Sequence, residues 1–209
     1  ISGQISFGHA MFVCAGGYAV AFISRKWTHI DSALLLAVGA GTGVILGIVV
    51  GSFVVRYRAI FFGMLNLALS MVLFAALGKF FNVTGGTDGL RLERAPFFGM
   101  TLERDAFESV LLVVGVALAL LSGWLVQRYL RSVAGQALAA IKTNETRLEY
   151  VGISAYQTLW IGYIISATLC GLSGAIFAIA QGLVTPEMGY WVRSGEIVFV
   201  AILGGVGHP

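Results

Sequence analysis

The chain carries very little charge for its length. Only 11% of its 209 residues are Asp, Glu, Lys or Arg, whereas 58% are hydrophobic, and the mean hydropathy is +0.89. Because soluble domains contain about 25% charged residues, this composition excludes that class of protein. The net charge of +3 is ordinary for a membrane protein and does not indicate a nucleic-acid partner.

The chain also has few cysteines and no recognisable pattern of catalytic or metal-binding residues. Cys14 and Cys170 both lie inside apolar runs, which favours small packing residues over a disulfide framework or a metal site. Paired carboxylates, His/Glu zinc spacing and a Ser/His/Asp set are missing, and the glycine-rich stretch 84–89 lacks the Lys-Ser or Lys-Thr of a phosphate-binding loop. We therefore expect no catalytic, cofactor or metal site, and no enzyme.

Long apolar runs take the place of these features. A run of about 20 residues crosses the hydrocarbon core as a helix, and Trp or Tyr residues at the run ends are typical of an aromatic belt. Five runs are long enough, and a sixth, 197–206, is too short; the five are 7–24, 32–55, 59–81, 106–125 and 157–184. The sequence predicts an all-α, polytopic transmembrane helix bundle. We interpret residues 1–209 as a single transmembrane domain and a fragment of a longer chain.

Glycine is abundant, with 28 residues. Gly39, Gly43, Gly47 and Gly51 recur every four residues and so share one face of a helix. The run 157–184 has a similar small-residue pattern that includes Gly171 and Gly174. Such faces let helix backbones approach closely in lipid. We expect these six glycines to pack helices within the bundle; the alternative is a face that slides during transport.

Polar residues within or beside the third run are candidates for a solute pathway. Asn66 and Ser70 lie one helical turn apart and either bond another helix or line a path. The following loop, 82–105, is rich in turn-forming residues and is a candidate cap on such a path or a docking surface. The candidate pathway residues are Asn66, Ser70, Thr84, Gly85, Gly86 and Asp88.

The segment 131–153 is the longest charged stretch of the chain. Val133, Ala137, Ile141, Leu148 and Val151 fall near helical spacing within it, which is a short amphipathic pattern. Such a helix either lies on the membrane surface or docks in a groove of a soluble domain, with Ile141 and Leu148 as anchors. The basic residues are nearly equal in number on the two sides of the membrane, so they do not settle the orientation.

The same segment resembles the coupling loop of branched-chain amino-acid ABC transporter permeases of the LivM type. The resemblance rests on residues 135–145 and 152–153, with Leu138-Ala139-Ala140 where many other importers have Glu-Ala-Ala. Further matches follow in family order at 3–10 with 16–18, 58–64, 84–90, 165–175 with Pro186, and 203–207. The resemblance therefore spans essentially the whole chain.

This resemblance implies a permease subunit of an ATP-driven importer for leucine, isoleucine, valine or related small solutes, in the bacterial inner membrane. It implies three kinds of partner besides the lipid bilayer: a second permease of the LivH type, two ATP-binding subunits that hydrolyse the ATP, and a periplasmic solute-binding protein. It places the coupling segment 128–156 in the cytoplasm and the loop 82–105 in the periplasm. The implied ATPase-coupling residues are Ala137, Ala140, Ile141, Asn144, Glu145, Leu148 and Gly152.

Two other functions compete with this interpretation. Related permeases serve urea and short amides, so the substrate class stays open. An ion-coupled secondary transporter is the alternative from a different class, and it predicts charged residues at mid-span. None of the five runs has a charged residue near its centre.

Overall fold

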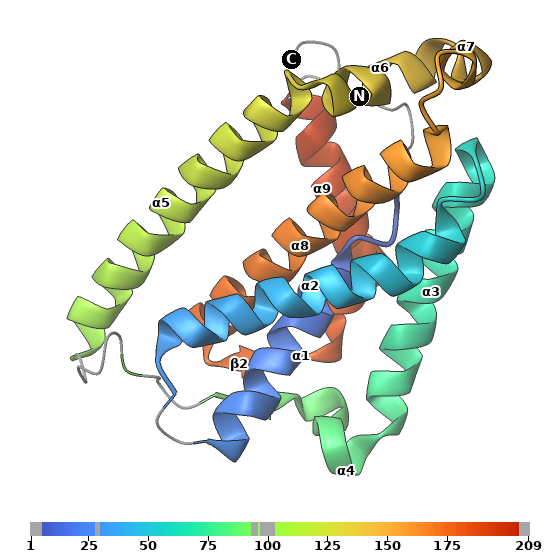
Figure 1. Cartoon of the computed structure of the whole chain (residues 1–209). Coiled ribbons are helices and arrows are strands. Elements are labelled where there is room, and N and C mark those ends of the chain that lie inside the picture. Colours follow the sequence, from blue (N-terminus) through green and yellow to red (C-terminus); the bar gives the residue numbers. More distant parts are fainter. Residues whose placement is uncertain (1–5, 28–29, 93–95, 97–102, 205–209) are drawn as a thin grey trace.

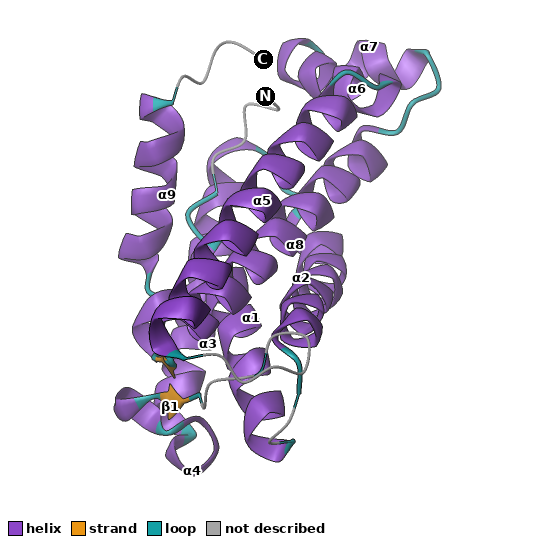
Figure 2. Ribbon diagram, turned by 90° about the vertical axis from the view of Figure 1, so that its left-hand side faces the viewer, coloured by secondary structure: helices purple, strands orange, loops and turns teal. Residues whose placement is uncertain are grey.

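The computed structural model describes residues 6–27, 30–92, 96 and 103–204, and most of these residues are helical. The elements in chain order are α1 (Ala10–Lys26), α2 (Ser32–Val54), α3 (Ala59–Lys79), α4 (Phe81–Thr84), η1 (Gly86–Asp88), β1 (Leu90–Arg91), α5 (Arg104–Leu130), α6 (Val133–Thr143), α7 (Glu145–Tyr150), α8 (Ala155–Gln181), β2 (Leu183–Val184), η2 (Pro186–Gly189) and α9 (Trp191–Leu203). Figures 1 and 2 show the resulting bundle. The predicted all-α polytopic bundle is confirmed.

Four described helices are long and apolar enough to cross a membrane, and they match four of the five predicted spans. They are α2, α3, α5 and α8. The first predicted span, 7–24, differs, because its helix α1 has 17 residues and begins only at Ala10. Gly8, just before α1, lies against the backbone of Asn66 in α3, where even a Cβ atom would clash. The chain therefore enters the bundle in non-helical form, and α1 starts between the other helices (Figure 1).

The centre of the bundle is built by α1, α2 and α8, which make the most extensive contacts of the fold. Gly39, Gly43, Gly47 and Gly51 are all buried on the α2 face that meets α8. A Cβ atom at Gly47 would lie 2.9 Å from the Ala167 Cβ. We call these four glycines, with Gly171 of α8, the glycine seam.

The glycine seam extends from α2 and α8 to α1. A Cβ atom at Gly171 would lie 2.9 Å from the Cα of Gly43, and one at Gly16 would lie 2.9 Å from the Cα of Gly171. Gly174 lies equally close to the backbone of Val13. Helix α8 thus meets both α1 and α2 backbone to backbone, which is the contact that stabilises helix association in lipid.

The two ends of the bundle are built differently. Helices α6 and α7 lie across one end, while α4 and the β1–β2 pair lie at the other (Figures 1 and 2). The strands are antiparallel, with Leu90 opposite Val184, and they tie the described part of the loop 82–105 to the end of α8. The rest of that predicted loop, at 93–95 and 97–102, lies outside the described residues.

Helix α5 stands apart from the other long helices (Figure 1). About half of its large apolar side chains are exposed, among them Leu112, Val116 and Leu120. A helix that crosses a membrane can expose such residues to lipid, because lipid tails are as apolar as leucine. The bundle is therefore tightly packed at the glycine seam and loosely packed along α5.

We predict that Gly43→Leu destabilises the bundle and that Gly41→Leu, on the same helix, does not. A Cβ atom at Gly43 would lie 2.8 Å from the Thr168 Cα, whereas nothing lies within 4 Å of one at Gly41. The leucine at position 43 forces α2 away from α8 and lowers the free energy of unfolding by roughly 1–3 kcal/mol. Denaturant titration of the purified protein in detergent measures this loss. Equal stability of the two variants would show that the glycine seam does not hold the helices together.

Candidate functional site

The segment between α5 and α8 folds into the two helices α6 and α7. Ser132 caps α6, since its side-chain oxygen accepts a hydrogen bond from the backbone N–H of Gly135. Gly152 follows α7 with a φ of 85°, a conformation that favours glycine. These two local signals let the chain leave α5, run across the end of the bundle and turn into α8.

The apolar face of this segment packs on its own chain. Ile141 and Leu148 are only 8% and 9% exposed and belong to one hydrophobic cluster with Leu159 and Tyr163 of α8. The hypothesis that these two side chains anchor a soluble partner is therefore corrected, because α8 already covers them. Val133, Tyr150 and Val151, at 74%, 86% and 77% exposed, are the exposed large apolar side chains of this segment.

The other residues of the implied coupling set divide between the two faces. Ala137 is buried with Ile141, whereas Ala140, Asn144 and Gly152 are exposed, and Glu145 is half-buried. The segment thus has an inner face that fixes it to α8 and an outer face that is accessible in this chain.

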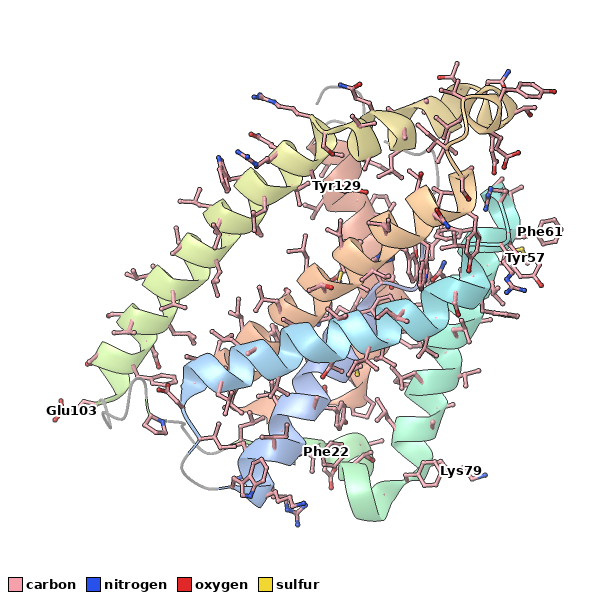
Figure 3. All side chains as sticks on the ribbon, in the orientation of Figure 1. Phe22, Tyr57, Phe61, Lys79, Glu103 and Tyr129 are labelled. Atoms are coloured by element: carbon pink, nitrogen blue, oxygen red, sulfur yellow. The ribbon has the colours of Figure 1, made fainter. Side chains whose placement is uncertain are left out.

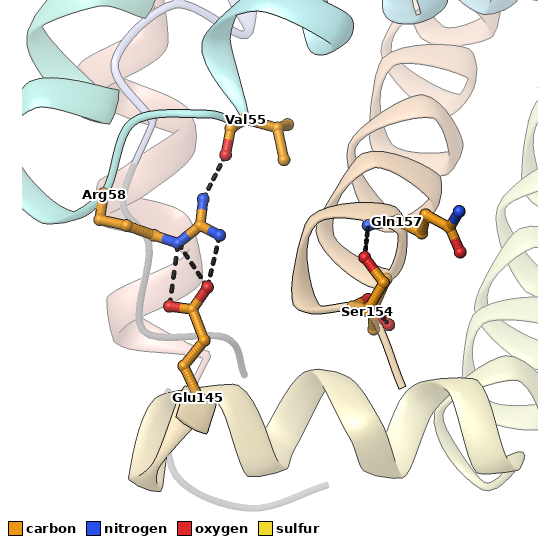
Figure 4. A network of polar contacts seen from close by, with 6 residues as sticks. Val55, Arg58, Glu145, Ser154 and Gln157 are labelled. Carbon is orange, nitrogen blue, oxygen red and sulfur yellow. Dashed lines mark hydrogen bonds and ion pairs between the residues drawn. The ribbon is translucent and has the colours of Figure 1, made fainter. Parts of the chain in front are cut away.

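An ion pair fastens the segment to the turn between α2 and α3. The Arg58 Nη2 atom lies 2.6 Å from the Glu145 Oε1 atom, and Arg58 Nε donates to both carboxylate oxygens at 3.1 and 3.2 Å (Figure 4). Arg58 also donates to the backbone carbonyl of Val55. The hydrogen bond from Arg58 lowers the pKa of the Glu145 carboxyl, because it favours the ionised form. The first residue of α7 is therefore held to the α2–α3 turn.

Further contacts join the end of α2 to the start of α8. The Tyr156 hydroxyl donates to the Ser52 carbonyl at 2.9 Å, and the Trp160 Nε1 atom donates to the Ile48 carbonyl at 3.3 Å. Ala59, directly after Arg58, has a φ of 52°, which is unfavourable for a residue other than glycine. Helix α7 thus holds the turn itself, while α8 holds the end of α2 that leads into it.

The predicted pathway residues Asn66 and Ser70 are completely buried and bonded to protein. Asn66 donates to the Phe62 carbonyl at 2.9 Å and accepts a hydrogen bond from the Tyr163 hydroxyl. Ser70 donates to the Gly189 carbonyl at 2.8 Å. Of the two alternatives left by the sequence, the structure therefore shows bonding between elements, and neither side chain lines an open path.

The candidates in the loop 82–105 form a local turn. The Thr84 hydroxyl lies 2.6 Å from the Leu77 carbonyl and 2.9 Å from that of Phe80. Gly85 and Gly86 have φ angles of 72° and 58°, and Asp88 is exposed. These contacts are separate from those of Asn66 and Ser70, so the structure does not bring the six candidate pathway residues into one site.

The structure instead shows a cavity that sequence reasoning missed. Its volume is about 400 Å³, and its wall comes from the residues before α1 and from α3, α5, α6, α8 and α9. Its polar lining residues are Ser6, His9, Tyr129, Tyr163 and Ser166. They come from three separate parts of the chain, so no local sequence motif predicts that they lie together. Within the described residues, no cluster of His, Cys, Asp or Glu could hold a metal ion.

Comparison with known proteins gives a family match over the whole chain. Residues 1–209 match the family described as "Branched-chain amino acid transport system / permease component". The high-affinity branched-chain amino acid transport system permease proteins LivM of Escherichia coli and Salmonella typhimurium are 26% and 25% identical over 99% of this chain and 53% of their own length. A probable branched-chain amino acid transport permease protein, LivH of Methanocaldococcus jannaschii, is 21% identical over 97% of this chain and 65% of its own.

The chain thus spans about half the length of the two LivM relatives. No solved structure matches it.

We predict that Glu145→Gln weakens the attachment of α7 in a pH-dependent way. The pKa of Glu145 lies below its ordinary value of 4.5, so the ion pair stabilises the fold above that pH and is lost as the pH falls through the lowered pKa. We expect Glu145→Gln to lower the free energy of unfolding by up to about 1 kcal/mol at pH 7, and the difference from the unaltered protein to vanish in acid.

Denaturant titrations at neutral and acidic pH measure this effect. Glu149→Gln is the matched control, because Glu149 is exposed in the same short helix. A loss of the same size in both variants at neutral pH would contradict the role given to the ion pair with Arg58.

Proposed function

Because the chain belongs to the branched-chain amino acid transport system permease family, we propose that it forms the membrane-embedded part of a permease subunit in an ATP-driven importer. The proposed solutes are leucine, isoleucine and valine, or related small molecules. The observation that carries this proposal is the family match over residues 1–209 on a multi-pass helical bundle. A permease component is not an enzyme, so ATP hydrolysis is assigned to separate subunits.

The proposed partners follow from that assignment. They are a second permease of the LivH type, two ATP-binding subunits and a periplasmic solute-binding protein, assembled in the bacterial inner membrane. The proposed orientation puts α6 and α7 in the cytoplasm and the turn at 82–91 in the periplasm. The resemblance of residues 135–145 to the coupling loop of such permeases supports it.

We propose that α6 and α7 couple ATP hydrolysis in the partner subunit to solute transport. Their outer face, with Tyr150 and Val151, is the contact surface for an ATP-binding subunit. Their inner face and the ion pair between Arg58 and Glu145 connect that surface to α8 and to the α2–α3 turn. A displacement of α7 would therefore move the ends of the long helices.

Neutral buried polar groups favour this proposal over ion-coupled transport. Among the described residues, the buried side chains include no Asp, Glu, Lys or Arg; the buried polar ones include Ser32, Asn66, Ser70, Thr84, Thr158 and Ser194. Ion-coupled transporters place charged residues inside the membrane to relay the ion.

The decisive experiment reconstitutes the full-length protein with its proposed partners in proteoliposomes and follows labelled leucine. We expect uptake that requires both ATP and the solute-binding protein. Competition by isoleucine, valine, urea and acetamide then distinguishes the amino-acid class from the short-amide class. Uptake driven by an ion gradient without ATP would overturn the proposal.

We predict that Val151→Asp uncouples ATP hydrolysis from uptake while the bundle stays intact. Val151 is exposed, so the new carboxylate meets the partner and disturbs that contact only. Ile141→Asp is the contrasting variant, because a buried carboxylate destabilises the protein itself. Parallel measurements of leucine uptake, ATPase activity and thermal stability separate the two effects. Normal uptake by Val151→Asp would exclude this surface from the coupling contact.

A further inference from the structure

The cavity beside His9 has apolar walls and one polar region. Its apolar lining includes Val126 and Leu130 of α5 and Leu159 and Leu169 of α8. The polar lining comes from Ser6, His9, Tyr129, Tyr163 and Ser166, and no lining residue among those described carries a permanent charge. Ligand pockets run from about 300 to 1,000 Å³, so a volume of about 400 Å³ suits a molecule of amino-acid size.

The polar region is held in place by the surrounding structure. The His9 Nδ1 atom lies 2.7 Å from the Ser6 hydroxyl. The imidazole also meets Phe12 and Tyr163 edge to face, with ring centres 5.7 and 5.6 Å apart. The Tyr163 hydroxyl is already bonded to Asn66. The contact with Ser6 occupies Nδ1, so a molecule in the cavity would bond the imidazole through its other ring nitrogen, Nε2.

Tyr129 offers a second polar group to the cavity. Its hydroxyl oxygen is buried and has no hydrogen-bond partner among the described residues. Figure 3 shows its side chain turned from the end of α5 toward the inside of the bundle. Buried polar atoms in proteins are nearly always hydrogen-bonded, so this hydroxyl is expected to bond a molecule that enters the cavity.

The cavity also touches the coupling segment. Leu138 of α6 is one of its lining residues, and it packs against Gly162 of α8, where a Cβ atom would lie 3.2 Å from the Leu138 Cδ1 atom. A movement of α6 would therefore change the shape of the cavity directly.

From these observations we infer that the His9 cavity is a solute site of this subunit and takes an amino acid with a short aliphatic side chain. The apolar walls receive the side chain, and the Tyr129 and Ser166 hydroxyls with the His9 imidazole bond the amino and carboxylate groups. A net-neutral zwitterion fits a lining without permanent charge. The inference rests on the proposed function, and it adds the location of the site and its contact with α6.

Uptake kinetics of the reconstituted full-length transporter test the polar contacts. We expect Tyr129→Phe and Ser166→Ala each to raise the KM for leucine roughly 2- to 10-fold, the effect of one lost hydrogen bond. Tyr57→Phe and Ser122→Ala are the matched controls, since both residues lie outside the cavity lining. Both controls are expected to keep the KM of the unaltered protein.

A change of cavity size tests the role of the apolar walls. The measured quantity is the ratio of phenylalanine uptake to leucine uptake, which a purely structural role would leave unchanged. Leu169→Ala enlarges the cavity, so phenylalanine uptake should rise several-fold relative to leucine uptake. Leu172→Ala is the control in the same helix, because Leu172 packs against the bundle core and does not line the cavity. Unchanged KM values together with an unchanged ratio of the two solutes would overturn the inference, while ATP-dependent uptake by the unaltered protein would leave the proposed function standing.

A binding experiment tests the cavity if ATP-dependent uptake itself is not found. Ser166→Cys is introduced into full-length protein in which Cys14 and Cys170 are replaced by alanine, and the rate of its reaction with N-ethylmaleimide is followed. Slower reaction in the presence of leucine than in the presence of lysine supports the site. Equal rates would overturn it, independently of the fate of the ATP-driven mechanism.

Discussion

The close approach of α2 to α8 is the contact on which the rest of the structure depends. In lipid, helices gain nothing from burying apolar side chains, so they must associate through close packing and hydrogen bonds. The glycine seam brings the two backbones together, and α1 joins them through Gly16 and Gly174. The ends of α2 and α8 are thereby fixed next to each other. That placement allows Tyr156 and Trp160 to bond the last turns of α2.

The closely packed helices α1, α2 and α8 form a fixed centre, and α5, α6 and α7 can move relative to it. Helix α5 has few buried residues, and it forms one wall of the His9 cavity. Helices α6 and α7 connect α5 to α8, and α7 is held to the α2–α3 turn by an ion pair that is partly exposed to solvent. A partner that pulls on α7 would thus act on one loosely packed helix and one firmly packed group of helices. The cavity lies between them.

Much of the fold could be predicted from the sequence, because the membrane imposes simple rules. Apolar length alone located α2, α3, α5 and α8, and a four-residue spacing located the face of α2 that packs. The start of α1 could not be read in this way, because the close contact of Gly8 with Asn66 depends on an element that lies over fifty residues away. The functional site was harder to predict from the sequence, because it too depends on contacts between residues that are far apart in the chain. Amphipathicity indicates that Ile141 and Leu148 face something apolar, but it cannot say whether that is α8 or another protein. The lining of the His9 cavity is assembled from distant segments and leaves no pattern in any one of them.

The order in which the chain is made has a consequence for how this bundle is assembled. Helix α2 must wait for α8 before its glycine face is covered, and α1 waits for the same partner. At a synthesis rate of about 5–20 residues per second, the roughly 100 residues between them take roughly 5–20 seconds to be made. During that interval the newly inserted α1 and α2 sit in the bilayer with an unfilled backbone groove, which other small-residue helices could occupy. Biogenesis of this protein is therefore most vulnerable to mispairing in the interval after α2 is inserted and before α8 leaves the insertion machinery.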